Sequence, residues 1–267
     1  MTTFDEYERE LWAGRASAYD RGFARLTAYT VGPLLDAAEV GSGTKLLDVG
    51  TGPGVVPAEA MRRGAEVAAV DADPEMAETA AGNVPGLDVR VAVLPELPFD
   101  GETFDAVVGN FVINHVGDPG AALAELRRVL RPGGRLALTC WEMPGSGALG
   151  IVRDAIDEAG VPWPDDIPVT PFMEYGERAA FERLVRGAGF PDARATALGW
   201  HHETDPEQWW ETGARSRVGS NGVIVSRQDA ATVARIKTAY DEIMSGYAVA
   251  DGKVSLPAHA LLVHATR

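Results

Sequence analysis

Residues 46–54 read LLDVGTGPG, an apolar run that passes directly into a series of glycines. A helix-like segment, Val55–Arg63, follows, so the chain is expected to turn from a buried strand into a helix at Gly50, Thr51 and Gly52. Glycines at such a turn let a ligand approach the backbone, and the free amides at the helix start favour electron-rich groups. The stretch therefore predicts an α/β fold with a ligand site at this turn.

The same alternation of strand and helix extends from residue 45 to residue 141. Its apolar runs are KLLDVG, EVAAVDA, DVRVAVL, FDAVVGNFVI and GRLALTCW. Apolar runs separated by amphipathic segments are typical of a parallel sheet that helices cover on both faces. A helix is predicted over Asp118–Leu130, because Asp118 can cap it and Pro119 suits its first turn. The sequence Pro132-Gly133-Gly134 is expected to stop it.

The C-terminal part contains two more strand-like segments, DARATALGWHHE at residues 192–203 and KVSLPAHALLVHATR at residues 253–267. We expect them to pair antiparallel at the edge of the sheet. Residues 41–267 are predicted to form the main domain. Residues 1–40 read as an N-terminal helical lid, and residues 143–176 and 205–250 as cap insertions, since such appendages often cover the ligand edge of an open sheet.

Charge and composition limit the partners of the protein. The 267 residues include 24 Lys and Arg against 39 Asp and Glu, a formal net charge of −15. Repulsion of polyanions makes nucleic acids and anionic membranes unexpected partners. Neither a basic N-terminus followed by an apolar stretch nor a long apolar run is found, so a cytoplasmic location is expected. The single cysteine, Cys140, lies in an apolar run and is expected to be buried. The sequence does not indicate an oligomeric state.

An acidic residue, Asp71, ends the apolar run that follows the glycine turn. A carboxylate there can accept two hydrogen bonds from a ribose diol. The NAD fingerprint G-x-G-x-x-G is not met, because Val55 stands in the third glycine position. Asp48 adds a carboxylate that repels a pyrophosphate but suits an ammonium or sulfonium group. The pattern therefore favours S-adenosylmethionine over NAD.

Four segments, in this order and spacing, resemble the class I S-adenosylmethionine-dependent methyltransferases: LLDVGTGPG, VDADPEM, LPFDGETFDAVVGNFVINHV and LRRVLRPGGRLALT. They are similar in style to the small-molecule branch, which includes ubiquinone and menaquinone C-methyltransferases and natural-product O- and N-methyltransferases. The resemblance implies a Rossmann-like three-layer sandwich. Its mostly parallel seven-stranded sheet would have the order 3-2-1-4-5-7-6, with the last strand antiparallel.

The resemblance also implies the cofactor contacts. Gly50, Thr51 and Gly52 would approach the methionine portion, Asp71 the ribose hydroxyls, Ala72 and Met76 the adenine, while Asn110 and Phe111 would flank the cofactor. One departure concerns Val93, where relatives commonly have an Asp that binds the adenine amino group. Recognition of adenine by backbone amides at Leu94, or by a neighbour such as Glu96, is then open.

Methyl transfer needs an aligned nucleophile and, for a hydroxyl or activated carbon acceptor, a base. His115 is the best candidate base, because it follows a strand predicted at Ala106–Ile113 and would lie at the carboxyl edge of the sheet. The alternative is that His115 hydrogen-bonds a loop or the cofactor. Tyr19 and Trp12 are expected on an N-terminal helix, where they would face the sulfonium or the substrate, or belong to the core.

No metal site is expected. His201 and His202 lie near Glu203 and Asp205, but adjacent residues on a strand point to opposite faces and do not share one ion. The leading hypothesis is a methyltransferase that acts on a small-molecule acceptor. The sequence Asn-Phe-Val-Ile at 110–113 lacks the Asn-Pro-Pro-aromatic pattern of amino-directed DNA methylation. An NAD-dependent oxidoreductase and a non-catalytic S-adenosylmethionine-binding protein are the alternatives.

Overall fold

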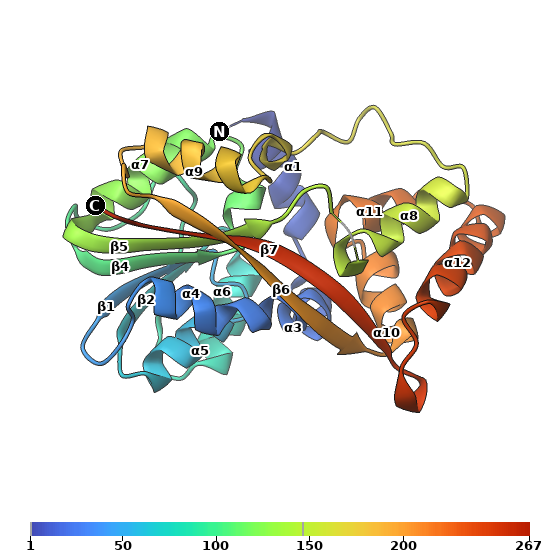
Figure 1. Cartoon of the computed structure of the whole chain (residues 1–267), viewed down its shortest axis with the longest axis horizontal. Helices are drawn as coiled ribbons and strands as arrows, with labels where there is room; N and C mark the ends of the chain where they lie inside the picture. Colours follow the sequence, from blue (N-terminus) through green and yellow to red (C-terminus); the bar gives the residue numbers. More distant parts are fainter. Residues whose placement is uncertain (1, 146) are drawn as a thin grey trace.

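The first apolar run forms an inner strand of a seven-stranded sheet (Figure 1). The computed structural model describes residues 2–145 and 147–267. Its strands are β1 Lys45–Val49, β2 Glu66–Asp71, β3 Asp88–Val91, β4 Phe104–Asn110, β5 Leu130–Trp141, β6 Arg194–Thr204 and β7 Val254–Thr266. Their order is β3-β2-β1-β4-β5-β7-β6, and β7 is antiparallel to both of its neighbours. The predicted order and the antiparallel last pair are confirmed.

Helices cover both faces of the sheet, as Figure 1 shows. Their bounds are α4 Val31–Ala37, α5 Val55–Arg62, α6 Pro74–Asn83, α7 Pro119–Val129 and α9 Arg178–Gly187. Successive side chains of a strand point to opposite faces. Leu46 of β1 accordingly packs in the cluster with α4 and α5, whereas Leu47 packs in the cluster with α7 and α9. Cys140 is fully buried in the latter cluster, as expected.

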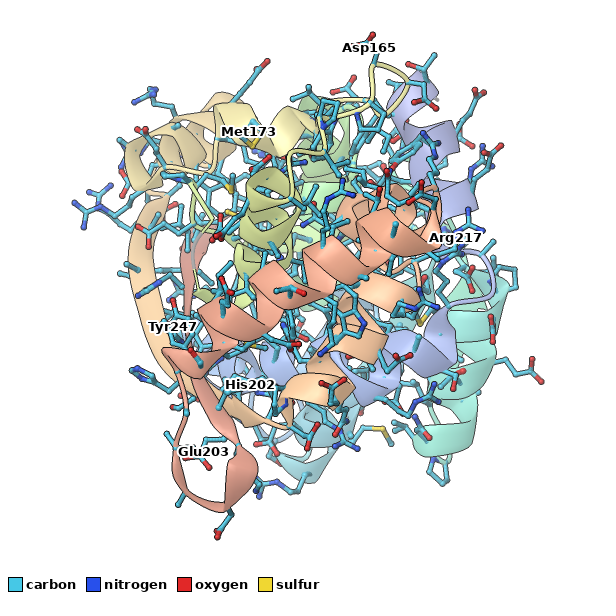
Figure 2. All side chains as sticks on the ribbon, turned by 90° about the vertical axis from the view of Figure 1, so that its right-hand side faces the viewer. Asp165, Met173, His202, Glu203, Arg217 and Tyr247 are labelled. Carbon is cyan, nitrogen blue, oxygen red and sulfur yellow. The ribbon has the colours of Figure 1, made fainter. Side chains whose placement is uncertain are left out.

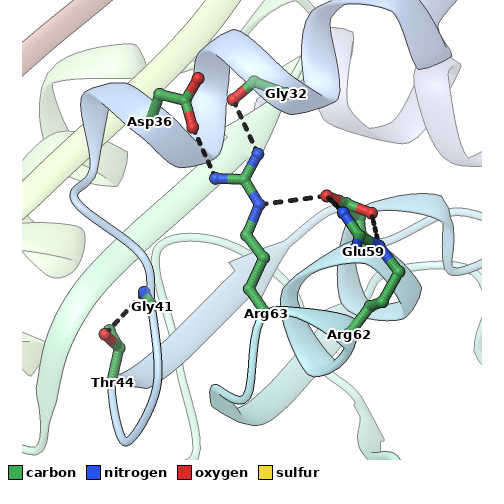
Figure 3. Close-up of polar contacts among 7 residues, drawn as sticks. All are labelled: Gly32, Asp36, Gly41, Thr44, Glu59, Arg62 and Arg63. Atoms are coloured by element: carbon green, nitrogen blue, oxygen red, sulfur yellow. Dashed lines mark hydrogen bonds and ion pairs between the residues drawn. The ribbon is translucent and has the colours of Figure 1, made fainter.

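Helices α4 and α5 are also joined at the surface by Arg63 (Figure 3). Its guanidinium donates to the Asp36 carboxylate at 2.6 Å and to the Gly32 carbonyl at 3.4 Å, both on α4, and to Glu59 of α5 at 3.1 Å. The Asp36 side chain is 72% exposed. Exposed ion pairs contribute under about 1 kcal/mol, so the apolar cluster and not this network holds the two helices together.

The remaining helices gather beyond the end of the sheet. They are α8 Ile151–Glu158, α10 Pro206–Trp210, α11 Gly219–Ser226 and α12 Ala230–Ser245. Strands β6 and β7 run past β5 and pair with each other as far as this region (Figure 1). Figure 2 faces the region: α12 crosses the front, Tyr247 follows its lower end, and Asp165 lies on the loop above. Trp209, Tyr240 and Ile156 share one buried cluster with Leu256 of β7.

The N-terminal segment is helical, as expected. It forms α1 Thr3–Trp12, α2 Ala16–Arg21 and α3 Phe23–Thr27, followed by a 3-10 turn that leads into α4. Thr2 and Asp5 form a reciprocal capping box that fixes the start of α1. The roles of this segment as a lid, and of residues 143–176 and 205–250 as a cap over a ligand, stay predictions. Among the described residues no helix is both long and apolar enough to cross a bilayer.

Two element boundaries differ from the sequence-based expectation. Strand β4 ends at Asn110 and not at Ile113, because Phe111 adopts φ +59° and donates its backbone N–H to the Thr139 hydroxyl at 2.9 Å. A left-handed residue ends the pleat. Helix α7 ends at Val129, before Pro132, since Leu130 already pairs with Phe104 of β4. In both places a contact with a distant segment ends the element.

Candidate functional site

The glycine turn after β1 has backbone geometry that favours glycine. Gly50 and Gly52 have φ values of +68° and +53°. A Cβ atom added at Gly50 would lie 2.4 Å from Cγ2 of Val112, in the loop after β4, whereas one at Gly52 would face the Tyr19 ring at 3.7 Å. Gly50 therefore allows the loops after β1 and β4 to pack against each other, and Gly52 keeps a space open towards Tyr19.

Asp71, at the end of β2, is tied to this turn. One of its carboxylate oxygens accepts from the backbone N–H of Gly52 at 2.8 Å, and the other accepts from the N–H of Asp73 at 3.0 Å. Burial raises the pKa of Asp71, and the two backbone hydrogen bonds oppose that shift. Each oxygen retains capacity for a further hydrogen bond, so the carboxylate is oriented and still able to accept from a diol.

A cavity of about 310 Å³, here called the strand-edge cavity, opens at the carboxyl ends of β1, β2 and β4. Its lining includes most of the residues that the sequence singles out: Tyr19, Gly50, Gly52, Asp71, Ala72, Met76, Leu94, Asn110, Phe111 and His115. Val93 also lines the cavity and Glu96 does not, which favours Leu94 over Glu96 as a neighbour of a bound base. Asp48 and Thr51 lie behind the wall and not on it.

The carboxyl group of Asp48 is buried and has no hydrogen-bond partner among the described residues. The Thr51 hydroxyl likewise lacks a partner within the part of the chain that the structure describes. Burial raises the pKa of Asp48 to about 8; the nearby Thr51 hydroxyl opposes this shift, and the negative charge of Asp71 adds to it. A positively charged group near the turn would favour the ionised form of Asp48. The site is therefore suited to a cation and not to a second anion.

The side chain of Asn110, at the end of β4, has three hydrogen-bond partners within the protein. Its Oδ1 accepts from the hydroxyls of Thr30 at 2.7 Å and Thr139 at 2.8 Å, and its Nδ2 donates to the carbonyl of Thr27 at 3.2 Å. The amide thereby joins β4 to β5 and to the N-terminal helices. The amide is thereby oriented, and one N–H of Nδ2 keeps the capacity to donate to a ligand.

A second cavity, of about 520 Å³, lies between the N-terminal helices and the region of α8, α10 and α11. We call it the cap cavity. Its wall is largely apolar and includes the aromatic residues Phe4, Phe23, Trp141, Trp163, Phe172 and Trp209. Five residues line both cavities: Glu8, Trp12, Tyr19, Phe111 and His115. The two cavities are therefore neighbours that share one wall.

His115 is held in this shared wall by a carboxylate that the sequence analysis missed. His115 lies in the 3-10 turn after β4, and its Nδ1 is 2.7 Å from Oε2 of Glu8 on α1. Trp12 Nε1 donates to the same oxygen at 3.0 Å. With Glu8 ionised, this oxygen accepts from both rings, so Nδ1 of His115 carries a proton and faces away from any acceptor at Nε2.

Aromatic rings complete this arrangement. The Trp12 ring lies edge-on to the rings of His115 and Tyr19, with centroid separations of 5.1 and 5.3 Å. Glu8 is buried, with a side chain that is 11% exposed. The sequence does contain a signal for Glu8, since it lies on the same helical face as buried Phe4 and Leu11. An acid on an apolar helix face indicates a buried partner.

The histidines of β6 are separated as predicted. His201 is exposed and His202 is buried, so they lie on opposite faces of the strand. Burial lowers the pKa of His202. In the part of the chain that the structure describes, no group of three or more His, Cys, Asp or Glu side chains is arranged to hold a metal ion.

Residues 47–138 match a family described as a methyltransferase domain. An uncharacterized methyltransferase of Mycobacterium tuberculosis is 36% identical over 137 residues, which are 51% of this chain and 54% of that protein. A demethylmenaquinone methyltransferase of Clavibacter sepedonicus is 36% identical over 138 residues, 48% of this chain and 56% of its own length. The chain thus spans about half the length of these curated relatives.

A solved structure with a similar fold is phosphoethanolamine N-methyltransferase 2 of Haemonchus contortus, in complex with S-adenosylhomocysteine. The TM-score is 0.56 at 16% identity, and the match covers 97% of this chain and 60% of that one. At this identity the likeness concerns the fold. Together with the sheet order, the family match confirms the resemblance seen in the sequence. Residues 47–138 of this chain therefore match a methyltransferase domain, and they lie in a sheet of the predicted strand order.

Proposed function

We propose that the protein transfers a methyl group from S-adenosylmethionine to a small-molecule acceptor by in-line displacement. The observation that carries this proposal is the shared wall: two cavities of about 310 and 520 Å³ meet at His115 and Glu8. A donor in one cavity and an acceptor in the other would meet there. The formal charge of −15 favours a small molecule over a nucleic acid as the acceptor.

The strand-edge cavity has residues that fit the cofactor. Asp71 is oriented to accept from ribose hydroxyls, and Ala72, Met76 and Leu94 supply an apolar surface for the base. The unpartnered carboxylate of Asp48 fits a ligand that carries a positive charge. When bound, S-adenosylmethionine supplies a methyl group on a sulfonium, and Tyr19 and Trp12 offer aromatic faces of the kind that attract such cations.

In this proposal His115 is the general base. Glu8 fixes the imidazole through Nδ1, so Nε2 is free to accept a proton from an acceptor hydroxyl. The carboxylate also stabilises the imidazolium that forms when the proton arrives. A base positioned in this way contributes about 10²- to 10⁴-fold to a rate.

Calorimetric titration tests the cofactor. We expect S-adenosylhomocysteine to bind and NAD not to bind. Transfer of labelled methyl from S-adenosylmethionine is then measured over a panel of phenols, quinones, amines and carboxylates, with a labelled product expected. Binding of NAD without S-adenosylhomocysteine would support an oxidoreductase instead. S-adenosylhomocysteine binding without transfer to any member of the panel would support a non-catalytic binding protein.

A further inference from the structure

The cap cavity contains two side chains with buried polar atoms that the protein leaves unsatisfied. Asn114 is 2% exposed, and both its Oδ1 and its Nδ2 lack a partner among the described residues. Arg153 has one such atom, Nη1. Both side chains line the cavity. Buried polar groups are nearly always paired in native proteins, so unpaired ones on residues that line a cavity point to a ligand that pairs with them.

Asn114 is held in place by its backbone and not by its amide. It lies immediately before His115, and its carbonyl accepts from the Thr170 hydroxyl at 3.2 Å. The neighbouring carbonyl of Ile113 accepts from the Tyr175 hydroxyl at 2.8 Å. The turn is therefore fixed from the side of the 170s loop, while the amide stays free at the point where His115 also faces the cavity.

Arg153, on α8, is held on one side only. Its Nε donates to Oδ2 of Asp157 at 2.8 Å, and its Nη2 pairs with the same carboxylate and reaches the Val161 carbonyl at 3.4 Å. The guanidinium also lies 5.4 Å from the centre of the Trp163 ring. These contacts orient the planar group and leave Nη1 for a ligand. A guanidinium keeps its charge at physiological pH and pairs well with a carboxylate.

The other charged groups at the cavity are Glu8, which is engaged with His115, and Asp154, which is exposed at α8. The rest of the wall is mainly apolar and includes nine Phe, Trp and Tyr side chains, which suit a flat ring system. Polar recognition is thus expected at two points, one beside His115 and one at Arg153. We propose that the acceptor is an aromatic hydroxy acid, whose hydroxyl binds at Asn114 and His115 and whose carboxylate pairs with Arg153.

This inference rests on the proposed function and adds a positioning role for Asn114. The hydroxyl oxygen accepts from Nδ2 of Asn114 and gives its proton to Nε2 of His115. The oxygen–carbon bond to the methyl group forms as the carbon–sulfur bond of the sulfonium breaks. The electron pair of that bond stays on sulfur, so the products are a methyl ether, a neutral thioether and an imidazolium.

Three matched probes test the acceptor class in the presence of S-adenosylhomocysteine. These are 6-hydroxy-2-naphthoate, 2-naphthol, which lacks the carboxylate, and 2-naphthoate, which lacks the hydroxyl. Calorimetry is expected to give a Kd for the hydroxy acid at least about tenfold lower than for either of the others. In Arg153→Met the preference for the hydroxy acid over 2-naphthol should disappear. Arg235→Met, at an exposed position of α12, should preserve it.

The Asn114→Leu variant distinguishes a role of Asn114 in binding the acceptor from a role in the stability of the fold. Leu has the branching of Asn but no polar atoms, so the thermal midpoint should stay the same or rise when the unpaired amide is removed. The affinity for 6-hydroxy-2-naphthoate should fall about tenfold. A lowered midpoint with unchanged probe affinity would make Asn114 merely structural and overturn its role.

The cofactor titration distinguishes the two proposals. If S-adenosylhomocysteine binds but the three probes bind equally well, or none binds, the acceptor class is wrong while the proposed function stands. If S-adenosylhomocysteine does not bind, the proposed function fails and this inference fails with it.

Discussion

The strand-edge cavity and the cap cavity are built differently. The strand-edge cavity takes much of its wall from the ends of β1, β2 and β4, whereas the cap cavity draws on segments from Phe4 to Asn221. Polar groups on the first wall are already engaged: Asp71 accepts from two backbone amides, and Asn110 has three partners. On the second wall Asn114 and Arg153 have unsatisfied atoms.

The strand-edge cavity is thus preorganised before a ligand binds, whereas in the cap cavity the ligand would supply the missing hydrogen-bond partners. Backbone amides and strand ends hold Asp71 in position before anything binds, so little reorganisation accompanies binding there. In the cap cavity the ligand itself is needed to satisfy the polar groups. Substitutions in the two cavities should therefore affect different measurements, and substitution of His115 or Glu8 in the shared wall should affect mainly the reaction rate.

The largest effect is expected at the shared wall. His115→Ala should lower the rate of methyl transfer about 100-fold or more, because the base is lost. The Kd of S-adenosylhomocysteine should stay within about threefold of the parent, since a base contributes mainly to the transition state. Steady-state kinetics and calorimetry measure both. His201→Ala, on the exposed face of β6, is the control. Activity within a few-fold of the parent would end the assignment of His115 as the base.

The second-largest effect is expected for a substitution in the strand-edge cavity, and it should concern cofactor affinity. Asp71→Asn keeps the shape of the side chain but places an amide where two backbone N–H groups donate. Hydrogen bonds to a charged group contribute about 1.5–3 kcal/mol, so the affinity for S-adenosylhomocysteine should fall roughly 30-fold. Calorimetry measures this, with the exposed Asp88→Asn of β3 as the control. An unchanged affinity would show that the carboxylate does not contact the cofactor.

Glu8→Gln tests the link between α1 and the wall. Gln keeps an acceptor for one hydrogen bond but lacks the charge that stabilises an imidazolium. We expect kcat to fall about tenfold, with KM and the affinity for S-adenosylhomocysteine within about twofold. Glu10→Gln, on the exposed side of the same helix, should change none of the three. A fall in cofactor affinity without a change in kcat would instead make Glu8 a binding residue.

The smallest effect concerns the pH dependence of stability. Burial raises the pKa of Asp48 to about 8 in the folded protein, from an ordinary value of 3.8. The folded state therefore binds the extra proton between these values, and the free energy of unfolding falls as the pH rises through them. Between pH 7 and 8 the loss from this group is about 1 kcal/mol.

Asp48→Asn should remove that loss, so the stability of the variant relative to the parent should increase by about 1 kcal/mol from pH 7 to pH 8. Urea unfolding at the two pH values measures the difference. Parallel pH dependences of the variant and the parent would contradict the raised pKa of Asp48.

Much of the fold could be predicted from the sequence, because each strand or helix is indicated by residues that are neighbours along the chain. Apolar runs mark the strands, and Asp118 with Pro119 marks the start of α7. The carboxyl ends of parallel strands meet at one edge, which is why Gly50 and Asp71 are found together. The end of β4 could not be placed from sequence, because it depends on the conformation of Phe111 and its contact with Thr139, 28 residues away.

The cap cavity was much less predictable. The contact between Glu8 and His115 joins residues 107 positions apart and depends on how α1 packs against the sheet. The cap wall likewise comes from short helices and loops with no shared motif, so Asn114 and Arg153 give no sign in the sequence that they face one space. Asp48 shows the converse: its type suits a cation, yet its side chain lies behind the wall.

Helix α1 lies against both cavities, and its position therefore bears on the rate at which ligands leave them. Its polar attachments to the rest of the protein include Glu8 to His115, Asp5 to the backbone N–H of Gly117 at 2.7 Å, and Tyr7 to Ser220 at 3.1 Å. A displacement of α1 that exposes one cavity exposes the other as well. In the proposed reaction, departure of the demethylated cofactor and of the methylated product would then be coupled, and the turnover rate would depend on how fast these three contacts break.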